Sequence, residues 1–142
     1  MQGQESFFVV LSSQSGNFVH PENSPSHFIH TLPQTLKFIS GGWEVRLVNI
    51  TLPKVQHTYS QIIVCMRGLE DSLVYSRHLP VLDVLTTPKR NVPNQTFTSD
   101  IYVGVNQINT GDIEMYILDD GLQSVSFEDK PVKVTLDFKR KP

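Results

Sequence analysis

The chain has very few residues of the type that forms disulfides or acts as a nucleophile. Its 142 residues include one cysteine, Cys65, and one tryptophan, Trp43. A single cysteine excludes an intramolecular disulfide framework. Cys65 lies in the apolar run Ile62–Met66, and free cysteine is among the residue types most often buried. We therefore expect Cys65 to be a core residue and not a nucleophile, since no neighbouring base would activate it.

Charge of one sign and long apolar runs are also missing. Twelve Lys and Arg residues against fourteen Asp and Glu residues give a net charge of −2, which argues against a nucleic-acid binder held by bulk positive charge. No apolar stretch approaches the ~18 residues of a membrane span. The N-terminal residues lack a basic segment followed by an apolar one, so we expect neither a signal peptide nor a membrane partner.

Motifs for catalysis or metal binding are absent. The sequence contains no G-x-S-x-G, no phosphate-binding loop, no H-E-x-x-H and no C-x-x-C. His27 and His30 are three residues apart, and such residues point to opposite faces of a strand, so we expect no shared metal. A cupin-type enzyme would need an H-x-H pair, which is missing. We predict no cofactor, no metal and no enzymatic activity.

Two charged clusters have simpler interpretations than a binding site. The first comprises the carboxylates Asp119, Asp120, Glu128 and Asp129. Their spacing fits no calcium loop, so we interpret them as solvated turn residues. The second cluster is the basic end Lys139, Arg140 and Lys141. Nucleic acid would be contacted at most indirectly, through these three charges.

The residues that are present form short strands. Apolar and polar residues alternate from Val132 to Lys139, as in a half-buried strand. Proline, glycine and Asp-Gly pairs separate such segments, and no window has the capped apolar stripe of a helix. We predict strands near residues 5–12, 27–32, 35–39, 43–52, 59–67, 72–78, 81–86, 97–106, 112–118, 123–127 and 131–140. The whole chain, residues 1–142, is then one all-β domain, an antiparallel β-sandwich or barrel.

Three details refine this prediction. In the segment that begins at Trp43, the alternation changes phase, which indicates a bulge near Val48 and Asn49. The run Ile62–Met66 is apolar at every position, which suits a strand covered on both faces. The expected core residues share inward positions of strands and are Trp43, Val45, Leu47, Ile113, Met115, Ile117, Phe127, Val132, Val134, Leu136 and Phe138. On the last strand, Lys133, Thr135, Asp137 and Lys139 should face outward or towards a neighbour.

Three regions of the chain together resemble a known family. They are Ser6–Ser13 with Phe18–Ser24 and Phe28–Pro33, then Gly42–Pro53, and finally Gly111–Ile117 through Val125–Phe127 to Val132–Arg140. In the family, F-Y-V-x-L-P-S-N leads to P-x-N and W-E-V-x-L-x-E-I-x-Y-P, and the end reads roughly I-x-I-x-I-x-D-x-x-G-x-x-V-x-F and V-x-V-T-L-x-F-R. The order resembles the minor capsid, or penton, protein of Maverick/Polinton elements and adintoviruses. Here the middle, residues 54–94, is more compact than in many members.

The resemblance implies a single jelly roll of about eight strands and a structural capsid role. It further implies a homopentamer at the capsid vertex, a major capsid protein as partner, and a virion protein assembled in the host cell nucleus. The alternative from a different class is a lectin-like or cytokine-like jelly roll that recognises a glycan or a receptor. Solution mass separates these functions, since only the capsid subunit should form a pentamer or larger particle.

An assembling subunit needs contact surfaces, and two segments are candidates. Charged residues make up 18% of the chain, below the usual ~25%, which leaves neutral surface for a partner to cover. The first strand has apolar residues on both faces, and the segment Thr86–Thr96 reads as a surface loop. The predicted subunit-interface residues are Phe8, Val10, Pro88, Lys89, Arg90, Asn91, Pro93, Asn94 and Thr96.

Overall fold

The computed structural model describes residues 6–15, 19–32, 42–86, 88–106 and 112–141. Within these ranges the chain forms eleven strands and no helix, hence none long enough to cross a membrane. The strands are β1 (Ser6–Ser12), β2 (His27–Thr31), β3 (Trp43–Leu52), β4 (Gln61–Met66), β5 (Ser72–Val74), β6 (Arg77–Leu79), β7 (Val81–Thr86), β8 (Gln95–Phe97), β9 (Tyr102–Gly104), β10 (Asp112–Asp119) and β11 (Lys133–Arg140). The prediction of an all-β fold is confirmed.

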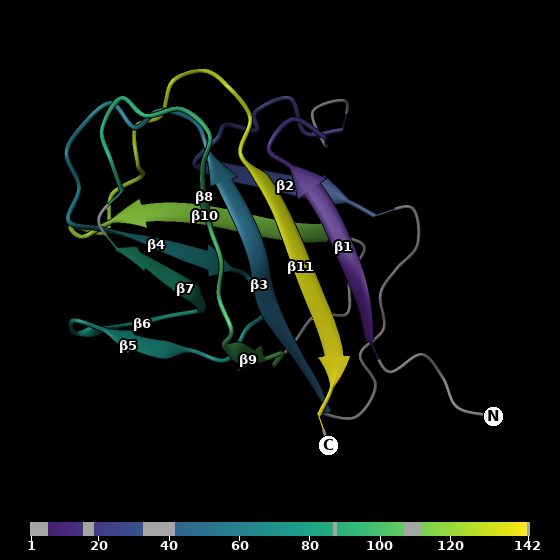
Figure 1. The fold of residues 1–142 in the computed structure, drawn as a ribbon. Helices are drawn as coiled ribbons and strands as arrows, with labels where there is room; N and C mark the ends of the chain where they lie inside the picture. The colour runs from purple at the N-terminus through teal and green to yellow at the C-terminus, as the bar shows by residue number, and fades with distance from the viewer. Residues whose placement is uncertain (1–5, 16–18, 33–41, 87, 107–111, 142) are drawn as a thin grey trace.

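Two antiparallel sheets pack face to face (Figure 1). Sheet A has the order β1-β11-β3-β8, and β9 also pairs with β3. Sheet B has the order β2-β10-β4-β7. Each sheet therefore joins strands from distant parts of the chain, with the first strand beside the last. This order is that of a single jelly roll, in which two Greek keys are folded into one sandwich.

The core fills the space between the sheets. Strict alternation on β11 turns Val134, Leu136 and Phe138 inward, where each is at most 1% exposed. Of the other expected core residues, the buried ones are Trp43, Val45, Leu47, Ile113, Met115, Ile117 and Val132. Phe127 is only partly buried and packs against the edge of this cluster.

The bulge predicted in β3 is confirmed. Thr135 of β11 is opposite Asn49, whereas the next residue, Leu136, is opposite Leu47, so Val48 is the extra residue. Two successive outward-facing residues, Val48 and Asn49, allow Ile50 and Leu52 to return to the core. The change of phase in the sequence is thus caused by this bulge.

Several predicted strand boundaries are wrong. Residues 123–127 form no strand and make only single bridges, between Ser124 and Leu118 and between Phe127 and Val55. The segment 72–78 is instead a hairpin of β5 and β6, with Tyr75 in the turn at a φ of 54°. Within the predicted strand 97–106, only Phe97, the last residue of β8, and Tyr102–Gly104 of β9 lie in strands. The predicted strand 35–39 lies outside the described residues.

A second apolar cluster lies on the outer side of sheet B. In β4, Ile62, Val64 and Met66 face the main core, while Ile63 and Cys65 face outward. The hairpin covers these two with Leu79 and Val74, and Val81, Tyr116, Leu118 and Leu122 complete the cluster. The run Ile62–Met66 is therefore covered on both faces, as predicted. Burial raises the pKa of the Cys65 thiol to about 12, although a hydrogen bond with Tyr116 opposes the rise.

Candidate assembly surface

The outer face of β1 carries the largest exposed side chains of the predicted interface. β1 is at the edge of sheet A and pairs with β11. Alternation turns Phe7, Val9 and Leu11 towards the core, where the Phe7 ring stacks on Phe138 with centroids 5.2 Å apart. Phe8 and Val10 consequently face solvent and are 66% and 73% exposed. Exposed apolar residues at a sheet edge are typical of a surface that a partner covers.

A polar network occupies the same outer face beside β1. Asp137 faces away from the core, but Tyr102 covers it, so it is only 8% exposed. The Tyr102 hydroxyl donates a hydrogen bond of 2.7 Å to its Oδ2 atom, and Arg46 Nη2 lies 3.8 Å from the same oxygen. Arg46 also donates to the Ser99 carbonyl at 3.0 Å. Phe8 is opposite Asp137 in the ladder, so this polar network borders the apolar part of the face, Phe8 and Val10.

The three basic residues at the C-terminal end all have partners within the chain. Lys139 lies over the Tyr102 ring at 4.4 Å and 3.8 Å from Glu44. Arg140 lies over the Trp43 ring at 5.5 Å, and Lys141 Nζ is 3.7 Å from Glu70 Oε1. Because each charge already has a neighbour that stabilises it, these residues do not form a free cationic surface for phosphate.

The predicted interface loop is only partly a loop. Thr96 lies on β8 and shares a hydrogen bond of 2.9 Å with Thr51 of β3. Pro88 is buried in the single chain. The other predicted interface residues of the segment, Lys89, Arg90, Asn91, Pro93, Asn94 and Thr96, are exposed, and so are Thr86 and Val92.

Side-chain hydrogen bonds fix the shape of this segment. Gln95 accepts from the Lys89 amide and donates to the Lys89 carbonyl, both at 2.7 Å. Asn91 and Asn94 have φ values of 62° and 56°, a conformation that asparagine adopts more readily than most residues. The segment is thus a preformed surface at one end of the sandwich.

Backbone bridges and hydrogen bonds connect the neighbouring loops to the segment 88–95. Val55 bridges Arg90 on one side and Phe127 on the other. The Lys54 amide donates to Glu128 Oε2 at 2.7 Å, and the Glu128 amide donates to the Lys54 carbonyl at 2.9 Å. The segments 53–60, 88–95 and 119–132 therefore form one connected end of the molecule.

The clustered carboxylates accept hydrogen bonds within these turns. Asp119 Oδ1 accepts from the amides of Gly121 and Gln123, at 2.8 and 2.9 Å. Asp120 Oδ2 accepts from the Ser60 hydroxyl at 2.6 Å. In the part of the chain that the structure describes, no group of three or more histidine, cysteine or acidic side chains could hold a metal ion.

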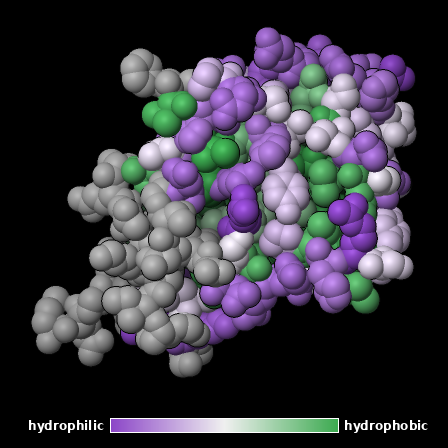
Figure 2. Space-filling model, turned by 180° about the vertical axis from the view of Figure 1, so that it is seen from behind, coloured by the Kyte–Doolittle hydropathy of each residue, from purple (hydrophilic) through white to green (hydrophobic). Residues whose placement is uncertain are grey.

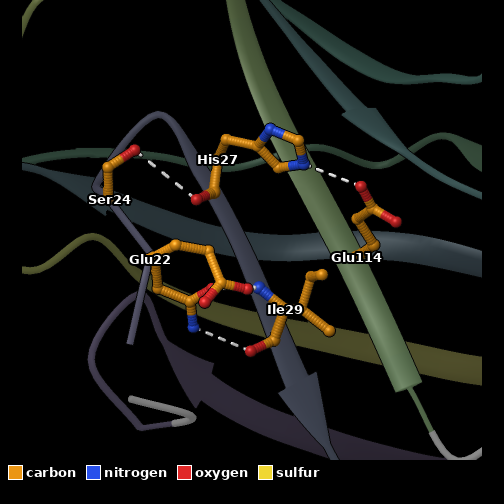
Figure 3. Close-up of a pocket in the computed structure, with 6 residues that line it drawn as sticks. Glu22, Ser24, His27, Ile29 and Glu114 are labelled. Carbon is orange, nitrogen blue, oxygen red and sulfur yellow. Dashed lines mark hydrogen bonds and ion pairs between the residues drawn. The ribbon is translucent and has the colours of Figure 1, made fainter. Parts of the chain in front are cut away.

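A pocket of about 310 Å³ lies beside the edge strand β2 (Figure 3). Its lining residues are Glu22, Asn23, Ser24, His27, Ile29 and Glu114. His27 Nε2 lies 2.7 Å from Glu114 Oε2, and Arg67 Nη1 lies 3.2 Å from the other oxygen. Burial would raise the pKa of Glu114, but the hydrogen bonds from His27 and Arg67 outweigh it and lower the pKa. The pocket is thus lined by groups already bonded to one another.

His27 and His30 point to different faces of β2, as predicted. His30 Nδ1 lies 2.8 Å from the hydroxyl of Ser15, in the turn after β1, whereas His27 bonds Glu114 at the pocket. This arrangement explains why the two imidazoles have separate partners.

Three exposed apolar residues near the hairpin were not among the predicted interface residues. Leu73, Tyr75 and Val84 are 67%, 62% and 41% exposed. The sequence offered no signal for them, because Leu73 and Tyr75 fell inside a predicted strand and Val84 lay in an apolar run. The hairpin packs on the outside of sheet B through Val74 and Leu79, and Val84 is opposite Ile63 on the same side of that sheet.

Comparison with known proteins establishes the fold of this chain. No protein-family model matches the sequence, and no curated protein matches it either. The crystal structure of the selenomethionine-labelled mavirus penton protein is similar, with a TM-score of 0.66 and 6% sequence identity. The match covers 96% of this chain and 100% of that one. The chain therefore has the fold of this penton protein, and the predicted single jelly roll is confirmed.

Proposed function

We propose that this protein is a structural capsid subunit of the penton type. The observation that carries the proposal is the similarity to the mavirus penton protein along the full length of that chain. A fold alone does not fix a function, so the surface matters as well. The exposed Phe8 and Val10 at the edge of sheet A supply the apolar area that a neighbouring subunit would cover.

In this proposal the subunits form a homopentamer at a capsid vertex and contact a major capsid protein around it. Ring closure requires a heterologous interface, in which one surface meets a different surface of the neighbour. The protein would be part of the virion. Assembly in the host nucleus is an expectation that follows from the sequence resemblance alone.

Sedimentation velocity across a range of protein concentrations tests the proposal. The wild-type chain should form one defined species with the mass of a pentamer. Phe8→Glu and Thr96→Arg should shift it to the monomer without loss of the folded circular dichroism spectrum. A chain that stays monomeric at its highest soluble concentration would refute autonomous assembly.

Val19→Glu is the matched control for Phe8→Glu. Val19 is also a large apolar residue, 60% exposed, but it lies in the connection between β1 and β2. The same charge placed there should leave the pentamer intact. Equal loss of the pentamer in both variants would show that the added charge, and not the β1 surface, is responsible.

A further inference from the structure

The segment that precedes β2 lies along the free side of that strand. Among the described strands, β2 pairs only with β10, so its other side is an edge of sheet B. An uncovered edge presents a row of unpaired N–H and C=O groups, which is a template for pairing with another strand. Residues 20–26, termed the strap, contact β2 on this side. The strap therefore lies where an added strand would pair.

Main-chain bonds connect the strap to the first outward position of β2. The Ser24 amide donates to the His27 carbonyl at 3.0 Å, and the His27 amide donates to the Ser24 carbonyl at 3.2 Å. The backbone groups of an antiparallel strand point alternately to its two sides. Those of His27 and Ile29, which are two residues apart, therefore point to the same side, away from β10.

At Ile29 the strap uses a side chain in place of a main chain. Asn23 Oδ1 accepts from the Ile29 amide at 2.9 Å, and Asn23 Nδ2 donates to the Ile29 carbonyl at 2.8 Å. A carboxamide carries both an acceptor and a donor, as a peptide group does, so it can bond both backbone groups of one strand residue. A turn holds Asn23 in place, since its own amide donates to the His20 carbonyl at 3.1 Å. Both backbone groups of Ile29 are thus occupied.

Further bonds hold both ends of the strap. His20 Nε2 lies 2.8 Å from Thr31 Oγ1, and the Thr31 hydroxyl donates to Asp112 Oδ1 at 2.7 Å. Because the hydroxyl proton of Thr31 goes to Asp112, the His20 ring donates at Nε2. At the other end, the Ile117 amide donates to the Ser26 carbonyl at 2.8 Å. The strap is thus bonded to β2 along its length and to β10 at its end.

The backbone of β2, more than the side chains around it, is what another strand would recognise. Figure 3 shows Glu22 and Ser24 of the strap beside His27 and Ile29 of β2, where they line the pocket. Figure 2, seen from behind, shows hydrophilic side chains mixed with apolar ones over the coloured part of the surface. Strand addition obtains its affinity from main-chain hydrogen bonds. Covering the outward N–H and C=O groups of β2 is therefore enough to block it.

We propose that the strap blocks the free edge of sheet B against pairing with β2 of a second copy, and that the Asn23 carboxamide does so at Ile29. Edge-to-edge pairing of this kind leads to aggregation, which natural β-proteins avoid by covering or charging their edges. The device is separate from the capsid role, because it protects any folded copy of the chain, whatever that copy assembles with.

Amide hydrogen exchange tests the bond at Ile29. Asn23→Ala removes the donor and the acceptor and adds no large apolar side chain. Exchange of the Ile29 amide, measured by nuclear magnetic resonance, should become roughly tenfold faster or more. Ser24→Ala is the matched control and should leave this exchange nearly unchanged, because Ser24 bonds His27 through its main chain. Equal exchange at Ile29 in the wild type and in Asn23→Ala would overturn the role of Asn23.

Aggregation tests the protection of the edge. Asn23→Ala should form aggregates that bind thioflavin T, at a concentration at which the wild type and Ser24→Ala form none in the same time. Ile29→Lys added to Asn23→Ala should suppress them, because a charged side chain on an edge strand opposes pairing. The amide at position 29 should still exchange fast in this double variant, since the carboxamide is not restored.

The outcomes separate edge protection from general instability. Aggregates that Ile29→Lys does not suppress would show exposure of the core and would overturn the proposal. Fast exchange at Ile29 without aggregation would overturn it too, because the edge would then be open without consequence. Circular dichroism checks that each variant keeps the all-β fold. Should Asn23→Ala fail to fold, Asn23→Leu keeps the size of the side chain without its amide, and the same results are expected of it.

Discussion

At the scale of single residues, burial decides which groups can react. Cys65 is 0% exposed and sits behind the hairpin, with Tyr116 beside its thiol. Burial raises its pKa to about 12, so the thiolate that reacts with maleimides is almost absent at neutral pH. We expect no labelling of the native protein and complete labelling in denaturant, measured by mass spectrometry. Rapid labelling of the native chain would show that the hairpin opens readily.

Glu114 should link stability to pH. Its folded-state pKa is lowered from the ordinary 4.5 by His27 and Arg67, against the effect of burial. A group with a depressed pKa stabilises the fold above its unfolded pKa, and this stabilisation is lost as the pH falls through the folded value. Glu114→Gln should therefore flatten the decrease in melting temperature below about pH 4.5.

Glu22→Gln is the control for this pH dependence. Glu22 lines the same pocket, but its side chain is 70% exposed and its closest ionic neighbour, His20, is 3.9 Å away. An exposed pair at this distance contributes little to stability. The control should therefore keep the acid profile of the wild type, and an identical flattening in both variants would contradict the role assigned to Glu114.

At the scale of strands, β11 shows how alternation divides core from surface. Phe138 is 0% exposed and stacks on Phe7, whereas Lys133 is exposed at the other end of the strand. Phe138→Ala should lower the free energy of unfolding by ~3–5 kcal/mol, because it removes a large buried ring. Lys133→Ala should change it very little. Denaturant titration of both variants measures this, and equal small effects would mean that the register of β11 is wrong.

The strand scale is also where sequence reasoning works best. Alternation on β11, the phase change at Val48 and the doubly covered run Ile62–Met66 are local patterns, and each is present in the structure. Residues 123–127 also alternate, but they cross over the end of the sandwich and make only single bridges. Short apolar segments do not specify whether a neighbouring strand is available to pair with them.

The candidate surface was less predictable because it depends on distant contacts. Asp137 was expected to face outward or towards a neighbour, and the residue that covers it, Tyr102, lies 35 positions away in the sequence. Phe8 and Val10 could be singled out from an apolar run on an edge strand. Leu73 and Tyr75 could not, since their position depends on the packing of the hairpin on sheet B through Val74 and Leu79.

At the scale of the whole molecule, association should appear in thermal stability. A partner that binds only the folded state raises the melting temperature as its concentration rises. A chain that assembles through Phe8 should therefore melt at a higher temperature when concentrated. For tight association, a rise of about a hundredfold in protein concentration adds up to ~2.7 kcal/mol to the stability of the folded state. Calorimetry over that range should resolve the resulting shift in melting temperature.

Phe8→Glu should remove this concentration dependence and leave the fold intact. Phe8 is 66% exposed in the single chain, and substitutions at exposed positions usually change stability by less than ~0.5 kcal/mol. The variant should melt at one temperature throughout, equal to that of the wild type at its lowest concentration. A variant that melts well below this limit would show that Phe8 stabilises its own chain. In that case, its exposed ring would not be a surface reserved for a neighbouring subunit.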